Sequence, residues 1–526
     1  MHDLETLRNG GYRGAGLTQL RLACPLAEFP EEILELGDTL ELLDLSGTGL
    51  PSLPANLGSA LPNLRTALFS NCAFKVFPRE IASCANLETV VFRNNGMEEI
   101  PEDAFPPRLR CLILTGNRLS SVPSSIGRCD GLEQCILTSN QLKDLPAELA
   151  NCKRLHTLRL SSNRLSSLPS WLSTFPELAF LSFASNPCAA PTTNGVHTPH
   201  GVASIPWTEL EIQQALGTNT SQGLWHQSPH FAEDVAIKLF RDPPASHNSD
   251  VGDDGSAADE MLANLKAGAH ESLVTILGQI HGHPDEDIAG ISQEEKEKEK
   301  EKEEKGTLQG GIVMQLLFDF YVPLSTLTPT TTTTTTATTA TTVITDDDAT
   351  VISAPPSSSP PIDARTALQM LSGLASCLAH LHGRGIAHGA VRPENVLASV
   401  GDAHALLTHF RAATRYCSRE QPPSSDEDDD NNLPEKVEVL AFGRLVDFVL
   451  LRLVRPAGSN GGGDGGGGGD DDKEGQAEAE KGLRELRDRC VAADTRERPT
   501  FEEVTEALEG LMGWRGMMRI PNIGSA

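Results

Sequence analysis

The sequence predicts a multidomain protein, with an N-terminal α/β solenoid followed by a C-terminal α+β domain. Leucines recur with a period of roughly 23 residues from Leu17 to Leu178, which indicates stacked repeats. After about residue 206, strand-like stretches are followed by longer segments with apolar residues at helical spacing. The length of 526 residues also exceeds the size at which one hydrophobic core stops growing, so at least two domains are expected.

The N-terminal repeats follow the pattern L-x-x-L-x-L-x-x-N-x-L. Eight copies begin at Leu17, Leu40, Leu64, Leu87, Leu109, Leu132, Leu155 and Leu178. Each copy is expected to form a short strand whose leucines fill a shared core, followed by a return segment that an apolar-Pro dipeptide opens, because no ladder donor is needed there. The pattern resembles the leucine-rich repeat, and its Leu-Pro copies resemble those of intracellular signalling proteins.

Two further features of the repeats are predictable. Five asparagines stand where a buried amide can bond backbone groups at a tight turn: Asn95, Asn117, Asn140, Asn163 and Asn186. Residues 186–188 then depart from the pattern and are expected to close the stack, because terminal repeats must shield the core from water.

One column of strand residues is a candidate partner-binding site. The residue between the two core leucines of each strand points onto the concave face. This column reads Arg21, Asp44, Leu68, Val91, Ile113, Ile136, Arg159 and Ser182. Its four successive apolar residues, on an otherwise solvated surface, predict a binding site for a protein partner. Two alternatives are that β-propensity alone favours Val and Ile there, or that the patch packs against the C-terminal domain.

Composition excludes several classes of function. The formal charge of −29 makes nucleic acid an unsuitable partner, since binding to it depends on Lys and Arg neutralising phosphates. No uncharged stretch is long enough to span a bilayer, and the N-terminus lacks a basic region followed by an apolar core. The 11 cysteines form no C-x-x-C pairs, so reduced structural thiols are expected. We therefore expect a soluble cytoplasmic protein.

The C-terminal domain carries a series of motifs in a fixed order. They are the turn 216–223, the strand 235–240, the helix start at Glu260, the segments 270–274 and 312–317, the loop 388–395, the segment 408–411, the helix segment 438–443 and the segment 498–501. In order and spacing they resemble the motifs of a protein kinase domain. The whole chain resembles leucine-rich repeat protein kinases of the intracellular type, which implies a bilobal α+β kinase fold.

This resemblance implies a nucleotide site. Lys238 would contact nucleotide phosphates and pair with Glu260 on the following helix, with Asp259 as a substitute partner. Gly217 would be the first glycine of a phosphate loop, G-x-G-x-x-G, whose other two glycines are replaced. The cofactor that the resemblance implies is ATP, and the sequence leaves open whether ATP is bound.

The same resemblance implies impaired chemistry. Ala390 stands where the motif H-R-D-x-x-x-x-N has its catalytic Asp, and His409 stands where D-F-G has its metal-binding Asp. Asn395 remains as a weak metal ligand, and an imidazole suits Mg²⁺ poorly, so Mg²⁺ binding is expected to be weak or absent. Arg411 replaces the D-F-G glycine and offers a cation to phosphate. With no A-P-E motif in the chain, Arg498 is expected to lack its usual glutamate.

We therefore predict a catalytically impaired pseudokinase that acts as a signalling scaffold, with phosphotransferase activity lost or very weak. The alternative is an active ATP-dependent protein kinase, for Ser/Thr or for Tyr, that uses unconventional residues such as Asp402 or Glu394. The sequence leaves this alternative open.

The predicted boundaries are residues 1–189 for the repeats, 190–205 for a linker, 206–515 for the kinase-like domain and 516–526 for a tail. Low-complexity segments are expected in loops of the second domain, since longer surface loops cost little closure entropy: residues 242–257, 294–305, 328–359, 424–432 and 458–472. Ser424 and Ser425 precede an acidic run, which suggests either phosphorylation by an acid-directed kinase or, as we favour, a solvated acidic loop.

Overall fold

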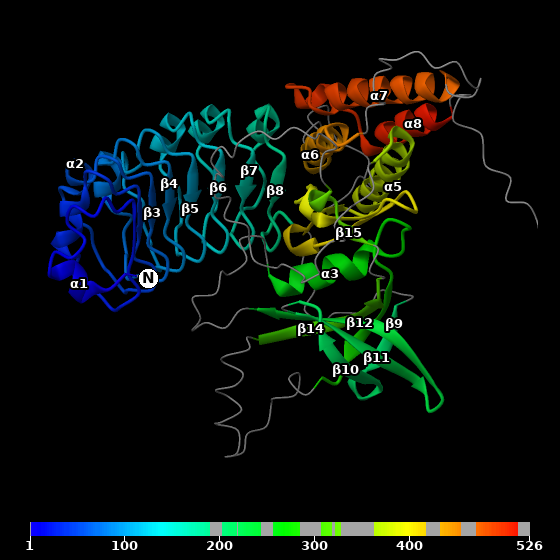
Figure 1. Ribbon diagram of the computed structural model, residues 1–526, viewed down its shortest axis with the longest axis horizontal. Helices are drawn as coiled ribbons and strands as arrows, with labels where there is room; N and C mark the ends of the chain where they lie inside the picture. The colour runs from blue at the N-terminus through cyan, green and yellow to red at the C-terminus, as the bar shows by residue number, and fades with distance from the viewer. Residues whose placement is uncertain are drawn as a thin grey trace, which may run out of the picture.

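The computed structural model describes residues 2–189, 202–217, 219–242, 256–283, 307–317, 321–327, 362–416, 432–453 and 470–513 (Figure 1). Several sequence predictions therefore fall outside the described residues. They are most of the linker, most of each low-complexity segment, the serines Ser424 and Ser425, and the tail.

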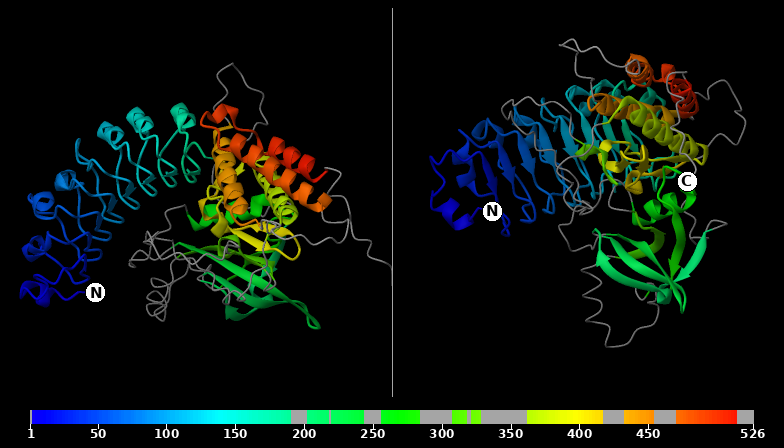
Figure 2. Two further views of the ribbon diagram at one scale, coloured as in Figure 1. Left: turned by 45° about the horizontal axis from the view of Figure 1, so that its top comes forward. Right: turned by 45° about the vertical axis from the view of Figure 1, so that its right-hand side comes forward.

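Eight short strands form one parallel sheet in sequential order, as the eight repeats predict. They are β1 (Gln19–Arg21), β2 (Leu42–Asp44), β3 (Thr66–Leu68), β4 (Thr89–Val91), β5 (Cys111–Ile113), β6 (Gln134–Ile136), β7 (Thr157–Arg159) and β8 (Phe180–Ser182). The middle residue of each strand points into the core and is at most 3 % exposed. Figure 2 shows the resulting solenoid, residues 4–189, as an arc with the rest of the protein at its C-terminal end.

The return segments are mostly short 3-10 helices that begin directly after a proline. They are η1 (Glu31–Leu36), η2 (Arg79–Ser83), η3 (Ser124–Arg128), η4 (Ala147–Asn151) and η5 (Ser170–Thr174), and each has a proline at its N-cap. The second repeat instead has a one-turn helix, α2 (Leu57–Ala60). Proline fits here because the first turn of a helix needs no backbone donor from it.

A helix that the repeat pattern does not predict covers the N-terminal end. Helix α1 (Leu4–Arg8) starts at Asp3, whose side chain accepts a hydrogen bond from Thr6 N. Leu7 is 2 % exposed and belongs to the solenoid core. With a single buried residue, this helix has no periodicity that a sequence pattern could reveal.

The second unit, residues 203–512, begins with an antiparallel sheet to which one parallel strand is added. The strand order is β10-β11-β12-β14-β13-β9. The bounds are β9 (Ala203–Pro206), β10 (Leu210–Ala215), β11 (Thr220–Ser228), β12 (Phe231–Asp242), β13 (Ile276–His281) and β14 (Thr307–Gln315). Helix α3 (Ala257–Ala267), capped by Ser256, packs on this sheet through Met261 and Leu265. The sheet starts at Ala203, inside the stretch predicted as linker. The sequence does not predict β9 because only Ile205 of this strand is buried, which leaves no alternating apolar pattern.

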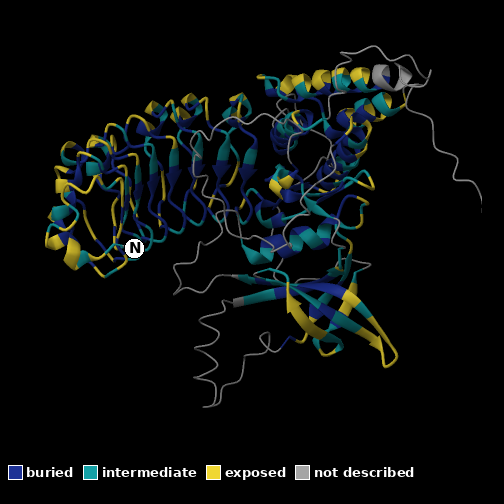
Figure 3. Ribbon diagram, in the orientation of Figure 1, coloured by how far each residue is buried: buried dark blue, intermediate teal, exposed yellow. Residues whose placement is uncertain are grey.

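The rest of the second unit is mainly helical. Its helices are α5 (Ala364–Gly383), α6 (Leu433–Leu450), α7 (Asp470–Cys490) and α8 (Phe501–Met512). Two small antiparallel sheets lie between them and the first sheet, made of β15 (Val322–Pro323), β17 (Val396–Ser399) and β18 (His404–Leu407), and of β16 (Ile386–Ala387) and β19 (Thr414–Arg415). Short 3-10 turns complete the unit: η6 (Trp207–Glu209), η7 (Leu324–Thr326), η8 (Pro393–Asn395), η9 (Phe410–Ala412) and η11 (Thr495–Glu497). Within the second unit, Figure 3 shows exposed residues mainly on the β10–β11–β12 strands and on helix α7.

The hydrophobic cores of the solenoid and the second unit interpenetrate. Leu433 and Val437 of α6 belong to the solenoid core, and Ala179 from the solenoid belongs to the helical core. The prediction that residues 186–188 close the stack is therefore incomplete. Cys188 does pack against the solenoid core, but helix α6 shields the last repeat as well, and this arrangement depends on a contact between segments about 250 residues apart in sequence.

Candidate functional site

A buried ion pair joins the first sheet of the second unit to its helix. The Nζ atom of Lys238, on β12, lies 2.5 Å from Oε1 of Glu260 on α3, and the two side chains are 22 % and 11 % exposed. The alternating strand places Lys238 on the same side as α3, and Ser256 caps the helix so that Glu260 falls in its first turn. The structure thus brings together the pair predicted from sequence, while its nucleotide-binding role remains a prediction.

Asp259, the substitute partner considered for Lys238, has a different contact. Its carboxylate accepts hydrogen bonds from Ser256 Oγ, at 2.7 Å, and from Ser185 Oγ of the solenoid. The side chain is 5 % exposed. Asp259 therefore ties helix α3 to the last repeat instead of pairing with Lys238.

The turn around Gly217 connects β10 to β11. The backbone N–H groups of Leu216 and Gly217 both donate to Thr220 O, at 2.9 and 3.0 Å. This is an ordinary hairpin turn, and the structure gives no contact between Gly217 and the Lys238–Glu260 pair.

The loop 388–395 is buried and held by backbone bonds. His388 is fully buried, its Nε2 lies 2.8 Å from Thr408 O, and burial lowers the pKa of its imidazole. Asn395 is 7 % exposed and its Nδ2 donates to Ala390 O at 2.8 Å. The amide of Asn395 therefore stabilises the conformation of the loop. Ala390 itself is 2 % exposed, so no side chain there offers a carboxylate to a substrate.

Gly389 stands where the motif H-R-D has its arginine, and the local backbone requires a glycine there. Its φ is +75°, and a Cβ atom at this position would lie 2.4 Å from Ala412 O. Only glycine adopts this conformation without strain while another backbone approaches so closely. Any larger residue would push residues 410–412 away from the loop.

The segment 408–411 has an unusual backbone at His409. This residue has φ +63° and ψ +67°, the left-handed conformation that non-glycine residues rarely adopt. Its Nδ1 lies 2.8 Å from Thr408 Oγ1, and Phe410 packs edge-on against His388 with ring centroids 5.0 Å apart. An imidazole therefore occupies the position where the kinase resemblance requires a metal-binding carboxylate.

The sequence reasoning missed the side chain that holds this loop in place. Glu438 on α6 is 2 % exposed; it accepts a hydrogen bond from Gly389 N and lies 2.8 Å from His382 Nε2. Burial opposes its ionisation, but the bonds to His382 and Gly389 leave the pKa of Glu438 below its usual value. His382 in turn contacts Tyr416 OH at 2.6 Å through Nδ1. The segment 438–443 is predicted as helix from its sequence, and its single acidic residue in an otherwise apolar run is the available signal for Glu438.

The end of the solenoid reaches the same loop. Arg159 on β7 is 4 % exposed and donates from Nη1 to Gly389 O at 2.9 Å. Phe183 N donates to Thr414 Oγ1 at 3.1 Å. The concave column of the repeats therefore ends against the loop that resembles the catalytic loop of kinases.

Arg498 was expected to lack its usual glutamate, and the structure gives it other partners. It is 1 % exposed and donates to three backbone carbonyls, those of Ala492, Lys436 and Pro176, at 2.9 to 3.2 Å. Burial lowers the pKa of its guanidinium to about 10. Backbone carbonyls thus receive the hydrogen bonds of Arg498 in place of the usual glutamate, and one of these carbonyls, that of Pro176, belongs to the solenoid.

Three of the four predicted partner-binding residues are buried, so the expectation that they lie on a solvated surface is wrong, while their binding of a partner stays a prediction. Val91, Ile113 and Ile136 are 5 %, 6 % and 8 % exposed and form a cluster of their own, with Leu68 partly buried beside them. They remain separate from the leucine core of the solenoid. The alternation of strand residues placed them correctly on the concave face, but alternation carries no information about what covers that face.

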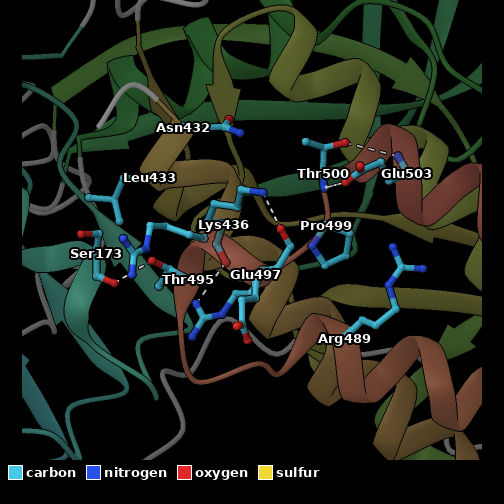
Figure 4. Close-up of a pocket in the computed structure, with 12 residues that line it drawn as sticks. Ser173, Asn432, Leu433, Lys436, Arg489, Thr495, Glu497, Pro499, Thr500 and Glu503 are labelled. Atoms are coloured by element: carbon cyan, nitrogen blue, oxygen red, sulfur yellow. Dashed lines mark hydrogen bonds between the residues drawn. The ribbon is translucent and has the colours of Figure 1, made fainter. Parts of the chain in front are cut away.

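A polar cavity of about 420 Å³ lies between the solenoid and α6–α8, where Ser173 faces residues 495–500 (Figure 4). Its lining includes Lys436, Arg489 and Glu503, and none of the residues of the predicted nucleotide site. Among the described residues, no group of three or more His, Cys, Asp or Glu side chains is arranged to hold a metal ion.

The cysteines in the described part of the chain form no disulfide. Burial raises the pKa of Cys84 to about 11 and that of Cys129 to about 12. These thiols stay protonated near neutral pH, which agrees with a structural role and argues against a reactive one.

Comparison with known proteins identifies the repeats. The family model described as Leucine Rich Repeat matches residues 154–175. The volume-regulated anion channel subunit LRRC8A of Homo sapiens is 29 % identical over 121 residues, which is 22 % of this chain and 15 % of the channel subunit. The Rattus norvegicus protein of the same name matches to the same extent. The match therefore spans about 15 % of the length of these curated relatives.

Among solved structures, an LRR protein of Leptospira interrogans, LIC12759, is 26 % identical and has a TM-score of 0.26, with 31 % of this chain and 47 % of that chain covered. The family-model match shows that the chain contains a leucine-rich repeat, and such repeats typically present a concave surface to protein partners. Within the described residues, no helix combines the length and the apolar character needed to cross a membrane.

Proposed function

We propose that this leucine-rich-repeat protein is a signalling scaffold whose second unit is a catalytically impaired protein-kinase-like domain. The observation that carries the proposal is the Lys238–Glu260 ion pair, at 2.5 Å, in a unit whose loop 388–395 offers Ala390 in place of a carboxylate. Phosphoryl transfer depends on metal binding and on a base that orients the nucleophile. A chain that keeps the pair but lacks both carboxylates is suited to bind or to transmit a signal, and poorly suited to catalyse.

The arrangement of the second unit supports this proposal. An antiparallel sheet with one packed helix precedes a helical region, and the loop 388–395 leads into the hairpin of β17 and β18. Glu438 holds the backbone of that loop through Gly389. These features agree with the bilobal fold that the sequence motifs predict.

A nucleotide would be held mainly by Lys238, whose side chain is partly accessible at 22 % exposure. ATP would supply phosphate oxygens to this ammonium group, and Glu260 would keep it oriented. The donor set around Asn395 and His409 does not suit Mg²⁺, which prefers several oxygen ligands including carboxylates. We therefore propose nucleotide binding that is weak and independent of Mg²⁺.

The alternative, an active kinase with unconventional residues, finds less support. Asp402 accepts a hydrogen bond from Ser399 Oγ at 2.7 Å within the turn between β17 and β18. Glu394 is exposed on η8. The structure gives neither carboxylate a contact with the Lys238–Glu260 pair.

Assays of the purified wild type, the variant Lys238→Met and the control variant Lys481→Met distinguish the impaired scaffold from the active kinase. Lys481 is exposed and pairs only with neighbours on its own helix, Glu478 and Glu485. We expect no autophosphorylation with labelled ATP above the level of Lys238→Met. In a thermal-shift titration, ATP at a hundred times its dissociation constant should add about 2.7 kcal/mol of stability, equally with Mg²⁺ or EDTA, and Lys238→Met alone should lose this shift.

Two results would contradict the proposal. Label transfer that requires Mg²⁺ and disappears in Lys238→Met would favour the active kinase. A missing ATP shift in wild type would remove nucleotide binding and leave a purely structural domain.

A further inference from the structure

The first turn of helix α3 directs two adjacent carboxylates to different parts of the molecule. Asp259 and Glu260 both follow the cap at Ser256. At 3.6 residues per turn, neighbouring side chains point about 100° apart around a helix axis. Glu260 pairs with Lys238 of the sheet at 2.5 Å, and Asp259 accepts a hydrogen bond from Ser185 Oγ of the solenoid. The rotation of α3 about its axis therefore sets both contacts together.

Ser185 occupies a turn position that recurs through the repeats, directly before each asparagine of the turn. Its φ is +55°, that of Ser162 in the preceding repeat is +57°, and that of Gly116 in an earlier repeat is +71°. Within the described residues, the hydroxyl of Ser162 makes no hydrogen bond, and Gly116 has no side chain. The turn thus forms without a hydroxyl bond, and the hydroxyl of Ser185 serves the contact with Asp259 instead.

The other end of α3 is held by different elements. Ala267 O lies 2.7 Å from His380 Nε2 on α5, and Met261 and Leu265 pack on the sheet. These contacts fix the C-terminal end and one face of the helix. The first turn, in contrast, meets the solenoid through the carboxylate of Asp259. This contact opposes rotation of the first turn, and hence movement of the neighbouring carboxylate away from the sheet.

The solenoid also holds a segment against which α3 packs. Both η9 and β19 contact this helix, and Phe183 N donates to Thr414 Oγ1 on β19 at 3.1 Å. Burial lowers the pKa of the neighbouring Arg415, and the negative charge of Asp259 opposes this shift. Asp259 therefore lies where the last repeat, α3 and β19 meet, and Figure 1 shows α3 between the end of the solenoid and the β12–β14 strands.

We propose that the last repeat of the solenoid positions the Lys238–Glu260 pair, by holding the first turn of α3 through Ser185 and Asp259. Ser185 and Asp259 are positioning residues that act through the helix. A protein partner that contacts the last repeat would compete for Ser185 and would alter the ion pair, and the effect is reciprocal because the two sites are linked. This deepens the proposed function: an effect on ATP rests on that function, whereas the positioning needs no nucleotide.

Pulsed acetylation of the purified full chain, followed by mass spectrometry, measures the ion pair without any nucleotide. The amine of Lys238 is only 22 % exposed and lies against Glu260, which shields it from an N-hydroxysuccinimide ester. Ser185→Gly suits the left-handed backbone and removes the hydroxyl. We expect this variant to acetylate Lys238 at least about threefold faster than the wild type. The matched control Ser162→Gly should label like the wild type. The rate at Lys436, which lies beside the same end of the solenoid, should stay constant in all variants.

A double-mutant cycle separates positioning from a general loosening of the fold. Glu260→Ala removes the ion pair, so Lys238 should be labelled faster in this variant. Adding Ser185→Gly to it should change the rate by less than about 1.5-fold, because both substitutions act through one contact.

Three results would overturn the positioning: unchanged labelling of Lys238 in Ser185→Gly, equal acceleration by Ser185→Gly with and without Glu260, or a parallel acceleration at Lys436. These rates are measured without ATP. A wild type that shows no thermal shift with ATP would therefore refute nucleotide binding and leave the positioning of the pair intact.

Discussion

His388 shows how burial decides the chemistry of a single side chain. The imidazole is fully buried, contacts Thr408 O through Nε2, and leaves Nδ1 without a hydrogen-bond partner. Because its partner is a carbonyl, Nε2 must carry the proton of the neutral ring. Burial lowers the pKa of His388, so the folded protein favours the neutral form. His388 therefore has a packing and hydrogen-bonding role in the catalytic-loop-like segment and does not act as a base.

The depressed pKa of His388 predicts acid lability. The unfolded chain binds a proton near the ordinary pKa of about 6.5, whereas the folded chain resists it, so stability present above that pH is lost as pH falls. Burial likewise lowers the pKa of His156 and His270. We expect the free energy of unfolding in urea to fall between pH 7 and pH 5, by up to about 1.4 kcal/mol per pH unit for each such group.

The variant His388→Gln keeps an N–H donor for Thr408 O and cannot titrate. It should flatten the pH dependence, whereas His226→Gln, at a side chain that is 45 % exposed, is the control. An unchanged slope in His388→Gln would show that this histidine is protonated equally in both states.

At the scale of the elements, the asparagine ladder connects successive repeats. Asn140 donates from Nδ2 to Leu114 O and Leu137 O, at 2.9 and 3.0 Å, and its Oδ1 accepts from Leu119 N at 3.1 Å. Asn117 and Asn163, in the repeats before and after, and Asn186, two repeats later, make equivalent bonds. Both ends of each amide are satisfied, as the sequence predicted, so each turn is held by its own repeat and by the one before it.

Loss of one amide in the ladder should be costly. Asn140→Ala would leave Leu119 N buried without its partner, which typically costs about 1–3 kcal/mol. It would also remove one of the donors to the carbonyls of Leu114 and Leu137, which keep those of Asn117 and Asn163. We expect a drop of at least about 2 kcal/mol in the free energy of unfolding, measured by urea denaturation. Asn151→Ala, at an exposed asparagine of the same repeat, should change stability by less than about 0.5 kcal/mol. Equal effects of the two substitutions would contradict a stabilising ladder.

At the scale of the whole molecule, each of the two units contributes residues to the hydrophobic core of the other. Val437 of α6 is 2 % exposed within the solenoid core. Thr495 donates to Ser173 O at 2.7 Å, Arg498 donates to Pro176 O at 3.0 Å, and Arg444 forms an ion pair with Glu177. Polar bonds to backbone and apolar packing thus fix the solenoid against the second unit, which makes independent movement of the two costly.

This interface predicts cooperative unfolding. Differential scanning calorimetry of the wild type should give one transition, because neither unit buries its end residues alone. Val437→Asp places a carboxylate in the solenoid core and should split the profile into two transitions, since burying an unpaired charge is strongly unfavourable. The control Val491→Asp, at a residue packed only in the helical core, should lower the temperature of that unit without separating it from the solenoid. Two transitions in the wild type would refute the coupling.

The strands, return segments and turns of the repeats were predictable because each depends on residues close together in the sequence. Leucine spacing indicated eight strands, proline marked the return segments, and the asparagines marked the turns. The Lys238–Glu260 pair was predicted from the order of motifs that resembles a protein kinase domain, because the strand pattern alone is equally typical of an exposed lysine. Residues such as Glu438 and Arg159 were not predictable, because each contacts Gly389 across a long separation in sequence.

The sequence by itself therefore determined the repeats, their core and the absence of carboxylates at residues 390 and 409, since residue identity and strand alternation suffice for these conclusions. Only the tertiary structure decided that the concave column is buried, that Arg498 bonds to carbonyl groups and that the solenoid contacts the loop at Gly389. The physical reason is that burial and hydrogen-bond partners depend on what packs over a residue. A period in the sequence specifies which way a side chain points, and the packing of distant segments specifies what it meets.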